Sequence, residues 1–187
     1  MVEAIHIHED DWGMRNLYPL AAADEASNAL SAARAASERN RDPSGFGWTD
    51  LHVFEAPSVT YADRGLRLGD AAAALEALMP RVRLFNATVG AAFEPGPQDP
   101  YGSYETEAWC FALDEDCFVK LEPQDDLVEG IWFELRTDEA TALATLRTAF
   151  ERLNALEPSY IVDYWRDVAG PVETEFLDCY FAVDPAA

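Results

Sequence analysis

The sequence predicts an α+β domain with a mixed or mainly antiparallel sheet, a three-stranded meander in its C-terminal half and helices packed on one face. Three observations predict this class. Strand-like segments alternate with helical segments in the first half, three strand-like segments with short connections follow in the second half, and an amphipathic helical segment comes directly after them. A chain of 187 residues can bury one sizeable core, so we expect residues 1–187 to form a single domain.

The first two elements are predicted from contrasting patterns. Residues 3–8 alternate isoleucine with histidine, which predicts a strand with its apolar side chains on one face. A loop through Pro19 is expected next. Residues 20–39 are almost all helix formers and small polar residues, and they stop before the breaker-rich stretch RDPSGFGW. We therefore predict a helix there that packs through alanine.

The rest of the first half is predicted from shorter signals. The expected elements are a strand at 48–57 (WTDLHVFEAP), a helix at 69–80 (GDAAAALEALMP) and a strand at 82–89 (VRLFNATV). The stretch 94–102 is rich in proline and glycine and shows neither helix nor strand periodicity, which predicts a loop.

The clearest local pattern is the meander. Strand-like segments at 105–113, 117–123 and 128–136 are joined by an acidic turn at 114–116 and a short turn at 124–126. Apolar residues at odd positions are expected to share one face of these strands: Trp109, Phe111, Leu113, Val119, Leu121, Ile131, Phe133 and Leu135.

The segment after the meander is predicted to be the helix that covers this apolar face. Thr137 is expected to cap it, and the acids at 138–139 complement its positive end. Large apolar residues recur at three- and four-residue spacing, as expected for a buried stripe: Leu143, Leu146, Phe150 and Leu153. Two last strands are predicted at 159–165 and 174–183.

The charge of the chain restricts its partners. With 35 acidic and 13 basic residues the net charge is −22, and the sequence pI is about 4.2. Such a field repels nucleic acid and anionic membranes, so we expect neither as a partner, whereas a basic protein surface would be attracted. Solubility and adaptation to salt are alternative explanations of the acidity. The absence of a basic leader and of a long apolar run favours a cytoplasmic protein.

Motifs for cofactor binding and nucleophilic catalysis are missing. The sequence has no G-x-G-x-x-G, no G-x-x-x-x-G-K-[ST] and no G-x-S-x-G, and its only lysine, Lys120, lies in a predicted strand. Cys110, Cys117 and Cys179 lack C-x-x-C spacing, so we expect buried thiols. The acidic clusters at residues 9–11 and 114–116 lack the spacing of a calcium loop, so we expect them to form solvated turns. We therefore expect no cofactor.

The three histidines are the candidate metal ligands. His6 and His8 lie one residue apart on the first predicted strand, and His52 lies on the second. If these strands are neighbours, the imidazoles together with Asp50 or Glu55 could form a three-nitrogen metal face with an open position. The alternative is that they are ordinary half-buried or surface histidines, which we favour because the sequence does not fix the register.

Aromatic residues among acids suggest a binding surface. Trp12 directly follows Glu9, Asp10 and Asp11, and Trp132 stands on the meander face opposite the predicted core. Rings set among carboxylates are typical of an interface that anchors by ring burial and selects a cationic partner by charge. A helix that covered this second meander face would instead place its aromatic residues in the core.

We therefore predict an acidic binding or inhibitory protein that associates with a basic protein partner, rather than an enzyme. The composition is similar to that of immunity proteins, small acidic bacterial proteins that neutralise basic toxins, although no motif adds to this likeness. The alternative is a metal-dependent enzyme of hydrolase type. The predicted partner-binding residues are Glu9, Asp10, Asp11, Trp12 and Trp132, and the metal ligands of the alternative are His6, His8 and His52.

Overall fold

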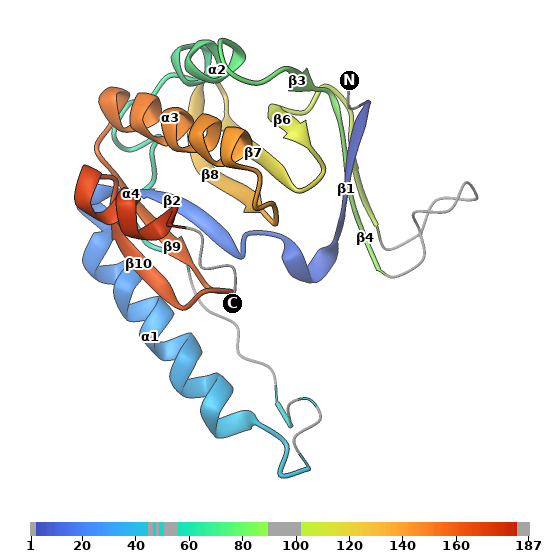
Figure 1. Cartoon of the computed structure of the whole chain (residues 1–187), viewed down its shortest axis with the longest axis vertical. Coiled ribbons are helices and arrows are strands. Elements are labelled where there is room, and N and C mark those ends of the chain that lie inside the picture. The colour runs from blue at the N-terminus through green and yellow to red at the C-terminus, as the bar shows by residue number, and fades with distance from the viewer. Residues whose placement is uncertain (1–2, 45–46, 48, 51–55, 90–101, 183–187) are drawn as a thin grey trace.

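A seven-stranded antiparallel sheet forms the centre of the structure (Figure 1). The computed structural model describes residues 3–44, 47, 49–50, 56–89 and 102–182. In spatial order the strands are β10 (Val168–Pro171), β9 (Ser159–Asp163), β2 (Arg15–Pro19), β8 (Leu127–Leu135), β7 (Cys117–Gln124), β6 (Cys110–Asp114) and β3 (Arg81–Val82). Helices pack on this sheet, and the predicted α+β class is confirmed.

The predicted three-stranded meander is confirmed in β6, β7 and β8. Val119 on β7 pairs with Phe111 on β6 and with Phe133 on β8, which fixes the register of all three strands. The register shifts between Glu122 and Pro123, where the proline has no N–H to donate to the ladder.

The main core lies on the face of the meander that carries the odd-numbered side chains. Three helices cover this face: α2 (Leu68–Glu76), α3 (Ala140–Leu156) and α4 (Thr174–Tyr180). The Phe150 ring of α3 meets the Phe133 ring of β8 edge to face, with 4.7 Å between ring centres. The predicted apolar face and the predicted helix stripe therefore share one core, with only the rings of Trp109 and the side chain of Leu113 partly exposed at its border.

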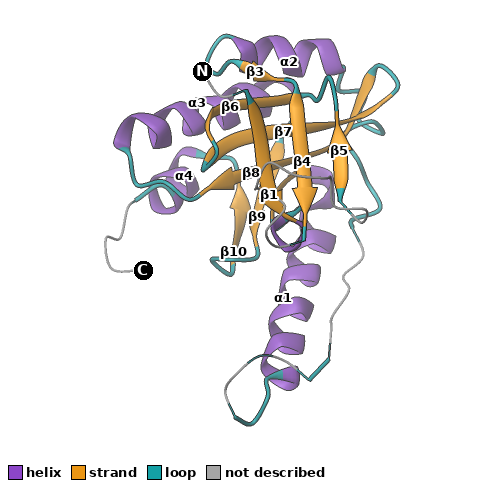
Figure 2. Ribbon diagram, turned by 90° about the vertical axis from the view of Figure 1, so that its right-hand side faces the viewer, coloured by secondary structure: helices purple, strands orange, loops and turns teal. Residues whose placement is uncertain are grey.

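A second, three-stranded sheet covers the opposite face of the meander (Figure 2). Its strands are β1 (Ala4–His8), β4 (Leu84–Thr88) and β5 (Ser103–Glu105), with β1 parallel and β5 antiparallel to β4. The inward side chains of this sheet form a second core with even-numbered residues of the meander, among them Ile5, Ile7, Phe85, Phe118 and Trp132. The strand predicted at 3–8 is confirmed, and the cover of the second meander face is a sheet rather than a helix.

Residues 82–89 do not form the single strand that was predicted. The chain leaves the large sheet after Val82, which pairs with Cys110, and enters the small sheet at Leu84. Arg83 and Leu84 are both exposed, so the alternation breaks where the chain crosses between the sheets.

The stretch predicted as a loop before Pro19 contains β2, a central strand between β9 and β8. Its buried positions are Arg15, Leu17 and Pro19, so the sequence shows no apolar alternation. Arg15 can be buried because its guanidinium pairs with carboxylates of both neighbouring strands.

The C-terminal prediction is half right. The strand predicted at 159–165 is confirmed as β9, whereas the strand predicted at 174–183 is wrong, because residues 174–180 form α4. Leu177 and Tyr180 lie one helical turn apart and are both buried. A Cβ at Gly170 on β10 would lie 2.2 Å from the Phe176 ring, so glycine permits this helix to pack on the strand.

The helix after the meander begins later than predicted. Its N-cap residue is Glu139, so Thr137 is not the cap. The Thr137 hydroxyl instead accepts a hydrogen bond from the backbone N–H of Glu139 at 3.2 Å.

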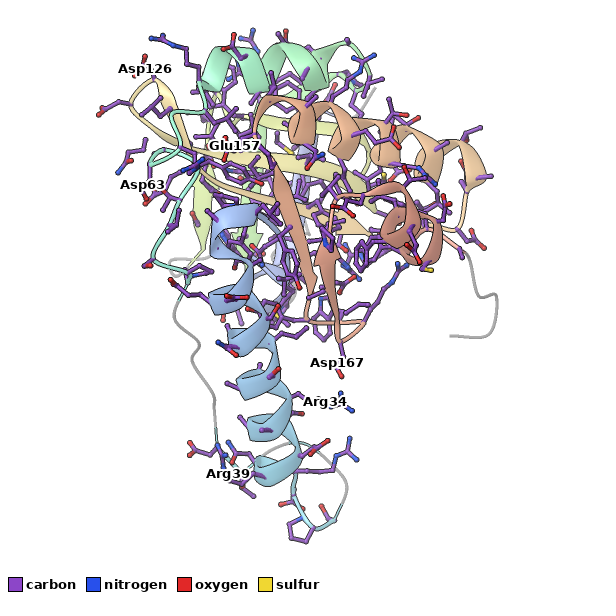
Figure 3. The ribbon with its side chains drawn as sticks, turned by 90° about the vertical axis from the view of Figure 1, so that its left-hand side faces the viewer. Arg34, Arg39, Asp63, Asp126, Glu157 and Asp167 are labelled. Atoms are coloured by element: carbon purple, nitrogen blue, oxygen red, sulfur yellow. The ribbon has the colours of Figure 1, made fainter. Side chains whose placement is uncertain are left out.

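The helix predicted at 20–39 is confirmed as α1 (Ala23–Asn40), preceded by the short η2 (Leu20–Ala22). Ala26 and Leu30 pack against Val162 on the face of β9 opposite the other three helices. The C-terminal half of α1 extends beyond the sheets (Figure 1). Arg34 on this helix pairs with Asp167 of the β9–β10 turn at 3.0 Å, and the two lie near each other in Figure 3.

Two other predicted elements lie largely outside the described residues. These are the strand at 48–57, most of which is not described, and the loop at 94–102, of which nearly all is not described. The helix predicted at 69–80 is confirmed in α2, which ends at Glu76. No described helix combines the length and the apolar character that a membrane crossing requires.

Phe150→Ala should lower the free energy of unfolding by about 3–5 kcal/mol, because it removes a fully buried ring from its contact with Phe133. Leu156→Ala is the matched control, since this leucine ends the same helix but is 44% exposed, and it should cost less than about 1 kcal/mol. Urea unfolding followed by circular dichroism gives both values. A loss of unfolding free energy below about 1 kcal/mol for Phe150→Ala would show that this ring is not part of the core.

Candidate functional site

The acidic run Glu9, Asp10 and Asp11 forms a short 3-10 turn, η1 (Glu9–Asp11), between β1 and β2. His8 caps the turn, because its Nδ1 accepts a hydrogen bond from the backbone N–H of Asp10 at 3.2 Å. Gly13 then adopts a φ of +68°, a conformation that glycine reaches without strain. Since β1 and β2 belong to different sheets, the acids are held at the junction of the two sheets.

A second acidic run, in the turn between β6 and β7, lies beside the first. Arg136, just after β8, joins them: its Nη1 is 3.5 Å from Oδ2 of Asp11 and its Nε is 3.2 Å from Oδ1 of Asp116. The six acids of the two runs form what we term the acidic edge: Glu9, Asp10, Asp11, Asp114, Glu115 and Asp116. The two runs were predicted as separate solvated turns, and no pattern in the sequence indicates that they converge.

Trp12 lies at this edge and is 38% exposed. Its ring stacks on Trp132 with 5.5 Å between ring centres, and it meets Phe85 of β4 edge to face at 5.6 Å. Trp132 itself is only 3% exposed, because the small sheet covers it, so its predicted place on a contact surface is corrected. Trp132 is instead the buried ring on which Trp12 stacks.

Lys120, the only lysine, is fully buried beneath this aromatic cluster. Its ammonium lies 2.8 Å from Glu105 of β5 and 3.1 Å from both carboxylate oxygens of Glu122. It also lies 5.2 Å from the centre of the Phe85 ring and 5.8 Å from that of Trp12. The buried charge therefore ties the large sheet to the small one and to the base of Trp12.

A buried ion-pair network continues inward from the acidic edge. Arg15 donates through Nη1 to Glu134 of β8 and through Nε to Asp163 of β9, the latter at 3.2 Å. The Tyr180 hydroxyl of α4 donates to Asp163 at 2.8 Å. Arg136 connects this network to the edge, since its Nε lies 3.9 Å from Glu134.

Sequence reasoning missed this network. Arg15 lay in a predicted loop and Tyr180 in a predicted strand, while Glu134 was placed only on the second meander face. The one available signal was Asp163, a carboxylate inside the otherwise apolar segment SYIVDYW. Burial raises the pKa of the Glu134 carboxyl, and the nearby guanidiniums of Arg15 and Arg136 oppose that shift only in part.

The two described histidines contact neighbouring elements: His6 lies against β4, and His8 caps η1. His6 and His8 lie on the partly exposed face of β1, and Nδ1 of His6 is 3.1 Å from Nδ2 of Asn86 on β4. Among the described residues, no group of three or more His, Cys, Asp or Glu side chains could hold a metal ion. His52 lies outside the described residues, so the three-histidine site stays a prediction.

Two of the three cysteines are buried, as predicted. Burial raises the pKa of the Cys110 and Cys117 thiols to about 12, so neither is a thiolate nucleophile near neutral pH. Cys179 is exposed, contrary to the prediction, because it is not among the residues that α4 buries, Leu177 and Tyr180.

Comparison with known proteins identifies no relative: no family model matches the chain, and no curated protein and no solved structure shows a significant match. Function must therefore be inferred from the residues and their geometry.

Glu134→Gln should change how stability depends on pH. The folded chain raises the pKa of Glu134, so protonation of this group favours folding, and its contribution to stability is present at low pH and lost as the pH rises through the folded pKa. Glutamine cannot titrate. The wild-type chain should therefore gain free energy of unfolding relative to Glu134→Gln as the pH is lowered from neutral, measured by urea unfolding at several pH values.

Glu129→Gln, an exposed position on the same strand, is the matched control. If both substitutions altered the pH dependence equally, the burial of Glu134 would not be the cause.

Proposed function

We propose that this protein is a binding or inhibitory protein whose acidic edge associates with a cationic surface of a partner protein, anchored by Trp12. One observation carries the proposal: two acidic runs more than a hundred positions apart converge on a single arginine, directly beside a partly exposed tryptophan.

The acidic edge remains strongly negative even when its pairing with Arg136 is counted. Two of its six carboxylates, those of Asp11 and Asp116, pair with Arg136, so the edge and this arginine together carry 1 − 6 = −5 within a chain of net charge −22. Complementary fields of this kind raise association rates by about one to three decades at low salt. Exposed ion pairs add little affinity, so the acidic edge would supply speed and selectivity rather than tight binding.

Trp12 can supply the affinity. Its ring is already held by Trp132 and Phe85 before any partner arrives, so little side-chain freedom is lost on binding. Partly exposed tryptophans in such positions often dominate interface energetics. The backing is rigid, since the stacked rings belong to a core buried between two sheets.

No observation among the described residues favours the metal-dependent alternative. His6 is placed against Asn86, and His8 caps η1. Neither has a cluster of further ligand side chains beside it in the described part of the chain.

The double substitution Glu9→Gln/Asp10→Asn should slow association with the partner by about three- to tenfold at low salt and leave the dissociation rate nearly unchanged. These two acids are exposed, and unlike Asp11 they do not pair with Arg136. The partner is first captured from the source cells with the wild-type chain as bait. Association rates are then measured by stopped-flow fluorescence across a range of ionic strength.

The control is Asp70→Asn/Glu76→Gln, which removes the same charge from α2 on the helix-covered face (Figure 1). Equal slowing by this pair would mean that only the overall charge matters. A wild-type association rate that does not change with salt would contradict electrostatic steering altogether.

Trp12→Ala should raise the dissociation rate from the same partner by about ten- to thirtyfold, because it removes the proposed anchor. Trp165→Ala removes another exposed tryptophan, 53% exposed, and should have less than about a twofold effect. Thermal melting of both variants verifies that each is folded. Equal effects of the two substitutions would refute a specific anchoring role for Trp12.

A further inference from the structure

A cavity of about 920 Å³ opens beside the buried ion-pair network, between α4, the start of α3 and the turn after β9. Its volume lies in the range of small-molecule sites. Apolar and aromatic side chains form much of its wall, including Leu143, Trp165, Phe176 and Phe181. The cavity is separate from the exposed acids of η1, which do not line it.

The charged groups that line this cavity are mostly positive, whereas the chain as a whole is negative. Among the described residues that line it, three are arginines, Arg15, Arg136 and Arg166, and one is an acid, Asp138, so their charges sum to 3 − 1 = +2. The carboxylates that pair with Arg15 lie behind it, since Glu134 is 2% exposed, Asp163 is 0% exposed, and neither lines the cavity. The cavity thus meets the cationic side of the ion-pair network.

Each of these arginines keeps hydrogen-bond donors in reserve. Arg15 uses Nε and Nη1 for its two carboxylates. Arg166 uses Nη1 for the backbone carbonyl of Tyr180, and its Nε lies 3.8 Å from Oδ2 of Asp163. Arg136 uses Nε and Nη1 for acids of the edge. Within the described part of the chain, Nη2 of all three has no acceptor. A guanidinium has five N–H groups in a planar fork, which matches a carboxylate.

We infer that this cavity binds a small organic anion: a carboxylate on an aromatic or branched apolar body. The guanidiniums would receive the carboxylate through charge-assisted hydrogen bonds. The rings of Trp165 and Phe176 would cover the apolar body. The acidity of the whole chain opposes anion entry at long range, but it is screened beyond about 8 Å at physiological ionic strength, whereas the arginines act in contact. This site is distinct from the acidic edge in position and in ligand charge.

Cys179 offers a direct readout, because it lines the cavity and is exposed, while Cys110 and Cys117 are buried with thiol pKa values raised to about 12. The uncharged reagent N-ethylmaleimide should therefore label Cys179 first, and intact-mass spectrometry follows the rate. Phenylacetate is the probe, and phenylacetamide is its uncharged match. At about 20 mM we expect phenylacetate to slow labelling about fivefold, as a dissociation constant of about 5 mM implies, and the amide to slow it less than about twofold.

Arg166→Gln should abolish the protection by phenylacetate, because it removes one of the three guanidiniums. Arg64→Gln is the matched control, an exposed arginine paired with Glu157 and absent from the cavity, and it should keep the protection, as should Glu9→Gln/Asp10→Asn. Equal protection by acid and amide in the wild-type chain, or no protection by the acid, would overturn the inference without reliance on any variant. Full protection in Arg166→Gln would overturn it as well.

Discussion

The rest of the structure depends on the burial of both faces of β7 and β8. Helices cover one face and the small sheet covers the other, so a charge in the middle of these strands has no route to solvent. Lys120 and Glu134 therefore need charged partners within the protein. Lys120 pairs with Glu105 and Glu122, and Glu134 pairs with Arg15. Loss of one partner of such a pair typically costs about 3–5 kcal/mol. The Lys120–Glu105 pair thus links the two sheets, the Arg15 pairs link β2 to β8 and β9 within the large sheet, and this arrangement places η1 and Trp12.

The parts of the fold that could be predicted are those in which side-chain periodicity matches burial. The odd-numbered residues of the meander and the stripe on α3 each face a single core, so their spacing is sufficient. β2 breaks this rule, because the buried neighbours of Leu17 are an arginine and a proline, and the arginine is tolerated only through partners on other strands. The segment of α4 is rich in aromatic residues that also favour strands, and the helix is favoured by tertiary contacts: the burial of Leu177 and Tyr180 and the packing of Phe176 over Gly170.

The candidate site was predicted in part, for a reason of distance along the chain. Glu9 to Trp12 are consecutive, so their combination of charge and ring is visible in the sequence. Their convergence with Asp116 is not, because it requires the β6–β7 turn and the end of β8 to meet η1, and no local pattern encodes that contact. Trp132 was assigned to the surface because a strand with aromatic residues on both faces does not reveal which face is covered, or by what.

Arg136 belongs to both surfaces that the structure presents. It neutralises part of the acidic edge through Asp11 and Asp116, and it also lines the cavity on the other side of the network. A carboxylate bound at Nη2 of Arg136 would neutralise part of the guanidinium charge while Nε and Nη1 stay with the two acids, which leaves the edge more negative. Occupation of the cavity and association with a cationic partner would then favour each other, and linkage requires such a coupling to be reciprocal. The two ligands have opposite charge and bind at different places, yet they act on the same side chain.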